Sequence, residues 1–350
     1  MKINIGGRAI GGNEPVLVVA ELSANHLQNF DMAVKTIEAM KASGADAVKL
    51  QTYTPDTMTI DSEKEYFKIN QGTIWDGEYL YKLYERAFTP WDWQPKLKKI
   101  AEDMGLIFFS TPFDESSADF LDSMGVCAYK IASCEITDIN FIEYVAAKRK
   151  PVILSTGIAG LADIEDAVAA CNRAGNKQLV ILKCISAYPA PVEEMNLMTM
   201  LDIRRRFNTI VGLSDHTLGV SVAIAAAALG AKVIEKHFIL DRKSGGPDAL
   251  FSMEPEEFED MVNHVRKAEK SLGSVTYELT AESKKNREFA RSIFVVKSIK
   301  AGQPFTKENI RSIRPANGLA PKYFNGIIGK KAAKNIERGM PLAWDMIADA

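Results

Sequence analysis

The segments Val211-Gly-Leu-Ser-Asp-His216 and Val233-Ile-Glu-Lys-His237 decide the fold of this chain. Each is a short apolar run that ends in a histidine, and the Ala-rich stretch between them, residues 217–230, is helical in character. This pattern predicts a β-α-β unit, in which the two strands lie parallel and adjacent. Both histidines then leave the sheet at its C-terminal edge, side by side.

The residues around these histidines indicate a metal site. Alternate residues of a strand share a face, so Ser214 lies on the face of His216 and Glu235 on the face of His237. Two imidazoles at one depth, beside a carboxylate and a hydroxyl, are typical of an open site for a divalent metal. The chain has only four histidines, and two of them end neighbouring strands. We therefore favour a metal site over two unrelated histidines, one buried and one on a loop.

The composition is that of an ordinary globular protein. The 350 residues are 47% hydrophobic and 25% charged, with a formal net charge of −2, so neither nucleic acid nor an anionic membrane is expected as a partner. The sequence shows no apolar run near the roughly 20 residues of a membrane span, and its N-terminus lacks the apolar region of a signal peptide. The four cysteines form no Cys-x-x-Cys pair, which predicts reduced thiols and a cytoplasmic location.

The strand–helix alternation of the opening unit recurs along most of the chain. Eight strands alternating with helices, then a last helix at Pro255–Leu272, predict a (β/α)₈ TIM barrel over residues 1–273. A doubly wound open sheet would more typically carry a glycine fingerprint after its first strand, and this chain has none. The strands are expected at Val16–Glu21, Ala45–Gln51, Leu106–Ser110, Cys127–Ile131, Pro151–Ser155, Leu179–Lys183, Ile210–Ser214 and Lys232–His237. Glycines at the position after a helix that favours left-handed backbone are Gly44, Gly105, Gly125, Gly175 and Gly230.

Three segments fall outside this alternation. Gly6-Gly7, between Lys2–Ile5 and Arg8–Ile10, predicts a β-hairpin that closes the floor of the barrel. Residues 53–89 are rich in aromatic residues and too long for an ordinary βα loop. On the catalytic face of a barrel such an insertion shapes a substrate pocket, and the alternative is a mini-domain that packs only on itself.

The third segment follows Gly273, where the barrel pattern stops. Residues 274–287 are polar and predict a linker with some helical content, and residues 288–350 form a separate small unit of short strands with Gly and Pro turns. A core of this size is marginal on its own, so we expect the unit to lean on another surface.

Polar residues gather at the predicted strand ends, where the chemistry of a TIM barrel takes place. Two lysines and several hydroxyls there suit a cradle for phosphate and carboxylate together, although each Ser or Thr taken singly is more typical of a helix N-cap. A buried, unpaired ammonium is costly, so Lys49 and Lys130 indicate a bound anion, with pairing to Glu21 or Glu235 as the alternative. A metal beside such a cradle suits either phosphate-ester chemistry or carbon–carbon bond formation.

A series of short motifs runs in order along the barrel segments: Ala20-Glu-Leu-Ser-Ala-Asn-His26, Val48-Lys-Leu-Gln51, Ser110-Thr-Pro-Phe113, Tyr129-Lys-Ile-Ala-Ser133, Leu154-Ser-Thr-Gly157, Tyr188-Pro-Ala-Pro191, Gly212-Leu-Ser-Asp-His-Thr217, Ile234-Glu-Lys-His-Phe238 and Gly246-Pro-Asp248. These motifs resemble those of the sialic acid synthase family in collinear order over nearly the whole chain. The motif at Ala20–His26 and the stretch Gln71-Gly-Thr-Ile-Trp-Asp-Gly77 look like the pseudaminic acid synthase branch of that family. Arg314-Pro-Ala-Asn-Gly-Leu319 looks like a C-terminal antifreeze-like (SAF, β-clip) domain.

The resemblance implies condensation of phosphoenolpyruvate with 2,4-diacetamido-2,4,6-trideoxy-L-altrose, giving pseudaminic acid and phosphate. An N-acetylneuraminate or legionaminate synthase would use the same chemistry on another sugar. The resemblance also implies that His216 and His237 bind Mn²⁺, Mg²⁺ or Co²⁺, and that Glu21 and Glu235 stabilise a developing cation or activate water. The residues implied to hold phosphoenolpyruvate are Lys49, Thr111, Lys130, Ser133, Ser155 and Ser214. Those implied to hold the sugar are Gln51, Tyr188, Asp248 and Arg314.

One position departs from the family pattern, because Ser186 stands where the neuraminate branch carries an asparagine; no substrate contact is assigned to it. The resemblance further implies a domain-swapped homodimer, in which the C-terminal domain covers the partner's active site. A cap that stabilises its own barrel is the alternative. Two hypotheses of other classes differ in simple observables: a metal phosphohydrolase would need no phosphoenolpyruvate, and a carbohydrate-binding protein would need no metal.

Overall fold

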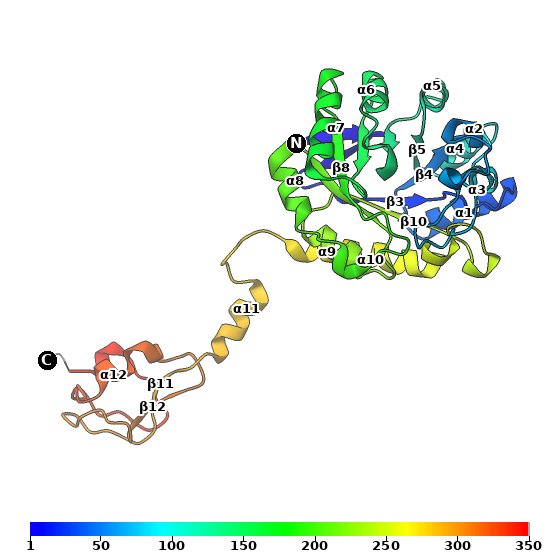
Figure 1. Ribbon diagram of the computed structural model, residues 1–350. Coiled ribbons are helices and arrows are strands. Elements are labelled where there is room, and N and C mark those ends of the chain that lie inside the picture. The colour runs from blue at the N-terminus through cyan, green and yellow to red at the C-terminus, as the bar shows by residue number, and fades with distance from the viewer. Residues whose placement is uncertain (349–350) are drawn as a thin grey trace. The chain divides into compact units, whose positions relative to one another are not determined.

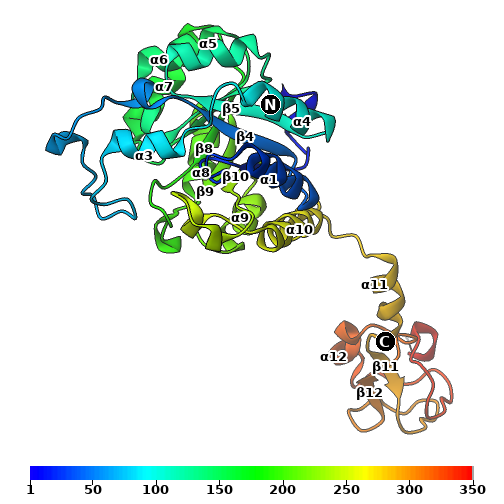
Figure 2. The ribbon, with the colours of Figure 1, turned by 90° about the vertical axis from the view of Figure 1, so that its right-hand side faces the viewer.

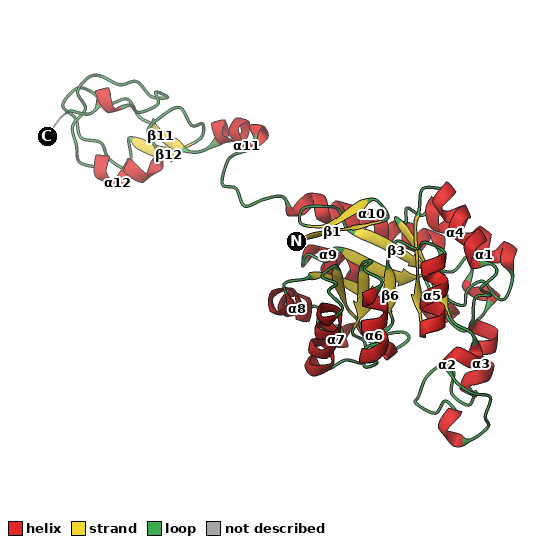
Figure 3. Cartoon of the chain, turned by 90° about the horizontal axis from the view of Figure 1, so that it is seen from above, coloured by secondary structure: helices red, strands yellow, loops and turns green. Residues whose placement is uncertain are grey.

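The computed structural model describes residues 1–348 and divides the chain into two compact units, one from Met1 to Gly273 and one that begins at Ser274. The first unit is a closed barrel of parallel strands in the order β10-β3-β4-β5-β6-β7-β8-β9. Helices surround the strands, as Figure 1 and the view from above in Figure 3 show. The TIM barrel predicted from the sequence is confirmed.

The barrel strands fall close to their predicted positions. They are β3 (Leu17–Glu21), β4 (Ala47–Thr52), β5 (Ile107–Pro112), β6 (Tyr129–Ile131), β7 (Val152–Ser155), β8 (Leu179–Lys183), β9 (Ile210–Asp215) and β10 (Val233–His237). The helices that follow strands are α1 (Phe30–Ala42), α4 (Gln94–Asp103), α5 (Glu115–Ser123), α6 (Ile139–Ala147), α7 (Leu161–Arg173), α8 (Thr199–Phe207), α9 (Ser221–Ala228) and α10 (Pro255–Leu272).

Two of these helices begin later than the sequence pattern predicts. The apolar periodicity of Glu194–Phe207 and Thr217–Leu229 predicts helices that start at Glu194 and Thr217, whereas the helices begin at Thr199 and Ser221. A residue with positive φ lies just before each observed start, Asn196 at 44° and Gly219 at 74°. Left-handed backbone cannot be part of a right-handed helix. Both helices therefore begin after these residues, although the apolar periodicity begins before them.

The N-terminal strands β1 (Lys2–Ile5) and β2 (Arg8–Gly11) pair in antiparallel register. Ile5 and Ile10 are fully buried and belong to one cluster with inward-facing barrel residues such as Val180. The hairpin therefore closes the floor of the barrel, as predicted, because apolar side chains at the open end of the barrel would otherwise face water.

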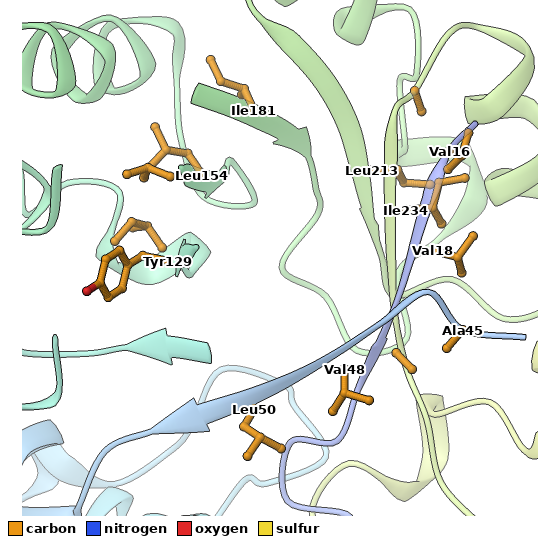
Figure 4. Close-up of a cluster of buried hydrophobic side chains, with 14 of the residues drawn as sticks. Val16, Val18, Ala45, Val48, Leu50, Tyr129, Leu154, Ile181, Leu213 and Ile234 are labelled. Atoms are coloured by element: carbon orange, nitrogen blue, oxygen red, sulfur yellow. The ribbon is translucent and has the colours of Figure 1, made fainter. Parts of the chain in front are cut away.

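Alternation along the strands separates two layers of side chains. Residues on the outer face pack under the helices and form the large buried cluster shown in Figure 4. On the inner face, Leu17 and Val19 of β3 are followed by Glu21, and Ala47 of β4 is followed by Lys49. The barrel interior thus changes from apolar at its floor to charged at the C-terminal ends of the strands.

The aromatic-rich insertion between β4 and α4 contains α2 (Pro55–Met58) and α3 (Leu80–Ala87). Figure 2 shows this segment standing out from the barrel beside α3. Its aromatic residues divide into two kinds: Tyr66 is 91% exposed, whereas Tyr53 is 3% exposed and packs edge-on against Tyr84, with ring centroids 5.6 Å apart. The buried members face the barrel, which supports a pocket rather than a self-contained mini-domain.

The second unit contains α11 (Ala281–Asn286), the antiparallel pair β11 (Ser292–Val295) and β12 (Ile310–Ile313), and α12 (Phe324–Ile327). A small apolar core, with Phe305 at 0% exposure, holds it together. Within residues 1–348, no helix is long and apolar enough to cross a bilayer.

Candidate active site

The inward side chains at the C-terminal strand ends form one buried, charged layer. Strand register places Glu21 beside Lys49 on one side and beside His237 on the other. Glu235 lies beside Ser214 in the same way. All five side chains are buried. The β-α-β argument from the sequence therefore places these residues correctly, because neighbouring parallel strands end at the same edge of the sheet.

The two histidines meet in this layer, with ring centroids 5.5 Å apart. Nδ1 of His216 lies 2.9 Å from the carbonyl oxygen of Ile185. Donation of the Nδ1 proton to that carbonyl leaves Nε2 as the free lone pair. Nδ1 of His237 is buried without a hydrogen-bond partner, 3.7 Å from Oδ2 of Asp248. Burial, followed by the charge of His216, holds the pKa of His237 well below its usual value, so this imidazole is neutral.

Burial lowers the pKa of His216, but Cys184, Ile185 and Glu235 outweigh it and the net shift is upward. Metal binding would therefore displace a proton from this imidazole, and the two imidazoles would then fit a divalent ion such as Mn²⁺. Among the side chains of residues 1–348, no group of three or more His, Cys, Asp and Glu could hold a metal ion by itself. The donor set thus resembles an open site, in which ligands other than protein side chains complete the coordination.

Lys49 is paired with carboxylates, which was the alternative left open by the sequence. Its Nζ lies 2.5 Å from Oε2 of Glu21 and 3.5 Å from Oε1 of Glu235. It also donates to Oγ1 of Thr111 at 3.2 Å. Burial lowers the pKa of Lys49, but the two glutamates outweigh it and the net shift is upward. The burial of Lys49 therefore does not by itself require a bound anion.

Lys130 is less well neutralised. Its Nζ donates to the carbonyl oxygen of Ile131 at 3.1 Å and lies 3.9 Å from Oε1 of Glu235. Burial outweighs that attraction and lowers the pKa of Lys130. Burial also raises the pKa of Glu21 to about 7, so at neutral pH the two lysines face less than two full negative charges. An anion bound beside Lys130 would supply the missing charge.

The hydroxyls of the predicted cradle line the same layer. Oγ of Ser155 is buried without a hydrogen-bond partner, and Oγ of Ser133 accepts the backbone N–H of Gly157 at 3.0 Å. A Cβ at Gly157 would lie 2.6 Å from Oγ of Ser133 and would collide with Oγ of Ser186, so only glycine lets these hydroxyls approach the backbone. Within residues 1–348, none of the predicted cradle residues is a helix N-cap, which was the alternative for each of them; these residues are Thr111, Ser133, Ser155 and Ser214.

A cavity of about 430 Å³ lies beside the charged layer and shares His237 with it. Gln51, Tyr188 and Asp248, three of the four residues predicted to hold a sugar, line this cavity. The fourth, Arg314, belongs to the second unit, where it directly follows β12 with its side chain exposed.

Sequence reasoning missed two residues of this region. Glu135 ends the 3₁₀ turn Ser133–Glu135, and its Oε2 is buried without a hydrogen-bond partner. Burial raises the pKa of Glu135 to about 7. Cys134, a free thiol, lines the cavity. Their position directly after Ser133, in the loop that follows β6, was the signal that could have revealed them.

These features define a class of protein: a (β/α)₈ barrel whose strand ends carry a two-histidine site beside buried lysines and a cavity of substrate size. A model of the NeuB family matches residues 36–277, and a model of the SAF domain matches residues 290–348. The chain belongs to the NeuB family. The resemblance to sialic acid synthases that the motifs indicated is thereby confirmed.

Relatives match along almost the entire chain. It is 45% identical to pseudaminic acid synthase from Campylobacter jejuni, over 93% of this chain and 95% of that protein. It is 44% identical to pseudaminic acid synthase from Helicobacter pylori, over 95% of this chain and 98% of that protein. The crystal structure of N-acetylneuraminic acid synthetase from Leptospira borgpetersenii in complex with citrate is similar, with a TM-score of 0.73 and 30% identity over 82% of this chain and 95% of that chain.

Proposed function

We propose that this chain condenses phosphoenolpyruvate with the open-chain aldehyde of 2,4-diacetamido-2,4,6-trideoxy-L-altrose, giving pseudaminic acid and phosphate. The proposal rests on one observation: two histidines, two buried lysines and a cavity of substrate size meet at the strand ends of one barrel. Relatives that are pseudaminic acid synthases, 44–45% identical to this chain, support this choice of sugar.

Phosphoenolpyruvate binds in the charged layer. Lys130 carries a positive charge that the protein only partly neutralises, and the phosphate and carboxylate of the substrate complete its pairing. Lys49 and the unpartnered hydroxyl of Ser155 contribute further donors, together with Thr111, Ser133 and Ser214. Charge-assisted hydrogen bonds of this kind are the strong ones in a buried site.

His216 and His237 would hold a divalent ion (Mn²⁺, Mg²⁺ or Co²⁺), since their ring centroids lie 5.5 Å apart and Nδ1 of His237 lacks a hydrogen-bond partner. When bound, this ion supplies Lewis-acid polarisation of the aldehyde oxygen of the sugar. Gln51, Tyr188 and Asp248 hold the sugar on the polar side of the cavity.

The two glutamates of the layer take different roles. Burial raises the pKa of Glu235, but Lys130 and Lys49 outweigh it and hold that pKa below its usual value, so Glu235 stays ionised. It stabilises the positive charge that develops at C2 of phosphoenolpyruvate as C3 attacks the aldehyde carbon. Glu21, with a pKa of about 7, accepts the proton of the water that captures C2. The resulting hemiketal phosphate then expels phosphate.

The second unit acts in a swapped homodimer, in which Arg314 reaches the sugar in the partner's barrel. Its exposed side chain and the polar linker support this arrangement. Residues 274–280 and the helix α11 connect the two units. Flexible chain of the length of residues 274–280 has an r.m.s. span of about 15 Å and the helix adds about 9 Å, enough to reach a neighbouring barrel. A cap on its own barrel is the alternative.

Phosphate release tests the proposed function directly. Purified protein is given phosphoenolpyruvate with the diacetamido-trideoxy-altrose, with N-acetylmannosamine or with the legionaminate precursor sugar. We expect the highest kcat/KM with the first sugar and no phosphate release without a sugar. A higher kcat/KM for N-acetylmannosamine would assign the chain to another sugar. Phosphate release without any sugar would instead support a phosphohydrolase.

A further inference from the structure

The cavity beside the charged layer has two chemically different walls. Gln51, Tyr188 and Asp248 form a polar wall at the strand ends. The insertion contributes a second wall that is mainly apolar, with Ile69, Leu80, Leu83, Tyr84 and Ala87 beside the polar Gln71 and Thr73. Hydrogen bonding of sugar hydroxyls accounts for the first wall but leaves the second without a role.

Trp75 joins the two walls. Its Nε1 donates to the carbonyl oxygen of Pro247 at 3.0 Å, next to Asp248. Its ring centroid lies 5.7 Å from that of Tyr188 and 6.5 Å from that of Phe251. The hydrogen bond uses the one polar atom of the indole, so the surface that Trp75 presents to the cavity is apolar.

The loop that carries Trp75 is organised around the next residue, Asp76. Its carboxylate accepts the backbone N–H groups of Gln71 at 3.2 Å, Gly72 at 2.9 Å and Thr73 at 2.9 Å. The backbone N–H of Gly77 then donates to Ile69 at 2.8 Å and closes the loop. Trp75 is therefore held in place by the loop itself as well as by Pro247, and a preorganised side chain contributes more to binding because less entropy is lost.

We propose that Trp75 and the apolar wall form a subsite for the methyl group of the C4 acetamido group of the sugar, and so select a diacetamido sugar over one with a hydroxyl at C4. This inference rests on the proposed function and deepens it. A methyl group against the indole removes apolar surface from water. A hydroxyl in the same place would lose its hydrogen bonds to water without replacement.

Two substitutions separate this role from that of a structural latch to Pro247. Trp75→Phe keeps an aromatic ring but removes the N–H donor, whereas Trp75→Ala removes both. Tyr66→Ala is the matched control, because Tyr66 lies in the same insertion and is 91% exposed. In the full-length protein, kcat/KM is measured for the diacetamido-trideoxy-altrose and for N-acetylmannosamine.

We expect Trp75→Ala to lower kcat/KM for the diacetamido sugar by about 10- to 100-fold, mainly through KM, the range for apolar contacts in specificity pockets. For N-acetylmannosamine the change is less than about threefold, Trp75→Phe lies between wild type and Trp75→Ala, and Tyr66→Ala leaves both values unchanged. An equal loss of kcat/KM for both sugars, with Trp75→Phe as impaired as Trp75→Ala, would overturn the subsite. Trp75 would then serve only to fasten the loop to Pro247.

A binding measurement without phosphoenolpyruvate separates failure of the subsite from failure of the proposed function. Saturation-transfer NMR reports which sugar protons contact the protein, and we expect strong transfer to the methyl group of the C4 acetamido group, which Trp75→Ala abolishes. If that signal behaves as expected but no phosphate is released in the turnover assay, the proposed function fails and the subsite stands. Turnover with a methyl signal that is indifferent to Trp75→Ala overturns the subsite alone.

Discussion

Nζ of Lys236 lies 2.8 Å from Oδ2 of Asp215, and both side chains are fully buried. The ammonium also donates to the carbonyl oxygen of Thr217 at 2.6 Å, whose own hydroxyl donates to Oδ1 of Asp215 at 2.7 Å. Asp215 precedes His216 and Lys236 precedes His237. The ion pair therefore ties together, from the outer face of the barrel, the two strand ends that carry the histidines.

Loss of this pair is expected to destabilise the barrel. Asp215→Asn leaves a buried ammonium without a counter-charge, which costs about 3–5 kcal/mol in free energy of unfolding. Denaturant unfolding followed by fluorescence measures the change. Asp103→Asn is the control, because it removes an exposed ion pair with Lys99 worth less than about 0.5 kcal/mol. Similar losses in the two variants would contradict the prediction.

Metal removal is expected to stop turnover. A chelator should abolish phosphate release from phosphoenolpyruvate and the sugar, and added Mn²⁺ should restore it. His216→Ala and His237→Ala should each lower kcat by at least about 100-fold while thermal unfolding still shows a folded barrel. His264→Ala provides the control, since this partly exposed histidine lies away from the strand ends and interacts with Asp260 of the same helix, α10. Full activity in metal-free buffer would rule out the metal site.

Stability should depend on pH through Glu135. Burial raises its pKa to about 7 in the folded protein, from an ordinary value of 4.5. The folded state therefore binds an extra proton between these values, and the free energy of unfolding falls as pH rises through this window. Glu135→Gln has no carboxyl group to titrate there, so its free energy of unfolding does not fall in this way. Relative to wild type, the free energy of unfolding of the variant should rise by about 1–3 kcal/mol as the pH goes from about 5 to about 8.

Urea unfolding at several pH values measures this difference, with the exposed Glu63→Gln as the control. A Glu135→Gln variant whose stability follows that of wild type at every pH would show that the carboxyl titrates in the folded protein as it does in water.

The role of Arg314 can be tested by mixing two inactive proteins. Arg314→Ala and His216→Ala chains, each nearly inactive alone, are unfolded and refolded together. If Arg314 acts on the partner's barrel, each mixed dimer contains one barrel with intact histidines that receives an intact arginine, and activity returns to about a quarter of the wild-type value, since about half the dimers are mixed and each has one complete site. If Arg314 acts on its own barrel, every site keeps one lesion and the mixture stays inactive.

The sequence alone determined the barrel and the identity of its strand ends. Alternating apolar runs and helices are local patterns, set by the two-residue repeat of strands and the 3.6-residue repeat of helices. Once the strands were counted, parallel pairing brought His216 and His237 to one edge without any knowledge of side-chain packing. The floor hairpin followed in the same way from Gly6-Gly7 and its flanking strands.

Only the tertiary structure decided which side chains of the site lie next to each other. Lys49 has glutamate partners because the barrel brings Glu21 and Glu235 to the same depth, whereas burial leaves Lys130 poorly neutralised. The hydrogen bond from Trp75 to Pro247 joins residues 172 positions apart, and no local pattern predicts it. Side-chain pairing and burial depend on distances across the folded chain, and these set the charge of the site and the apolar wall of its cavity.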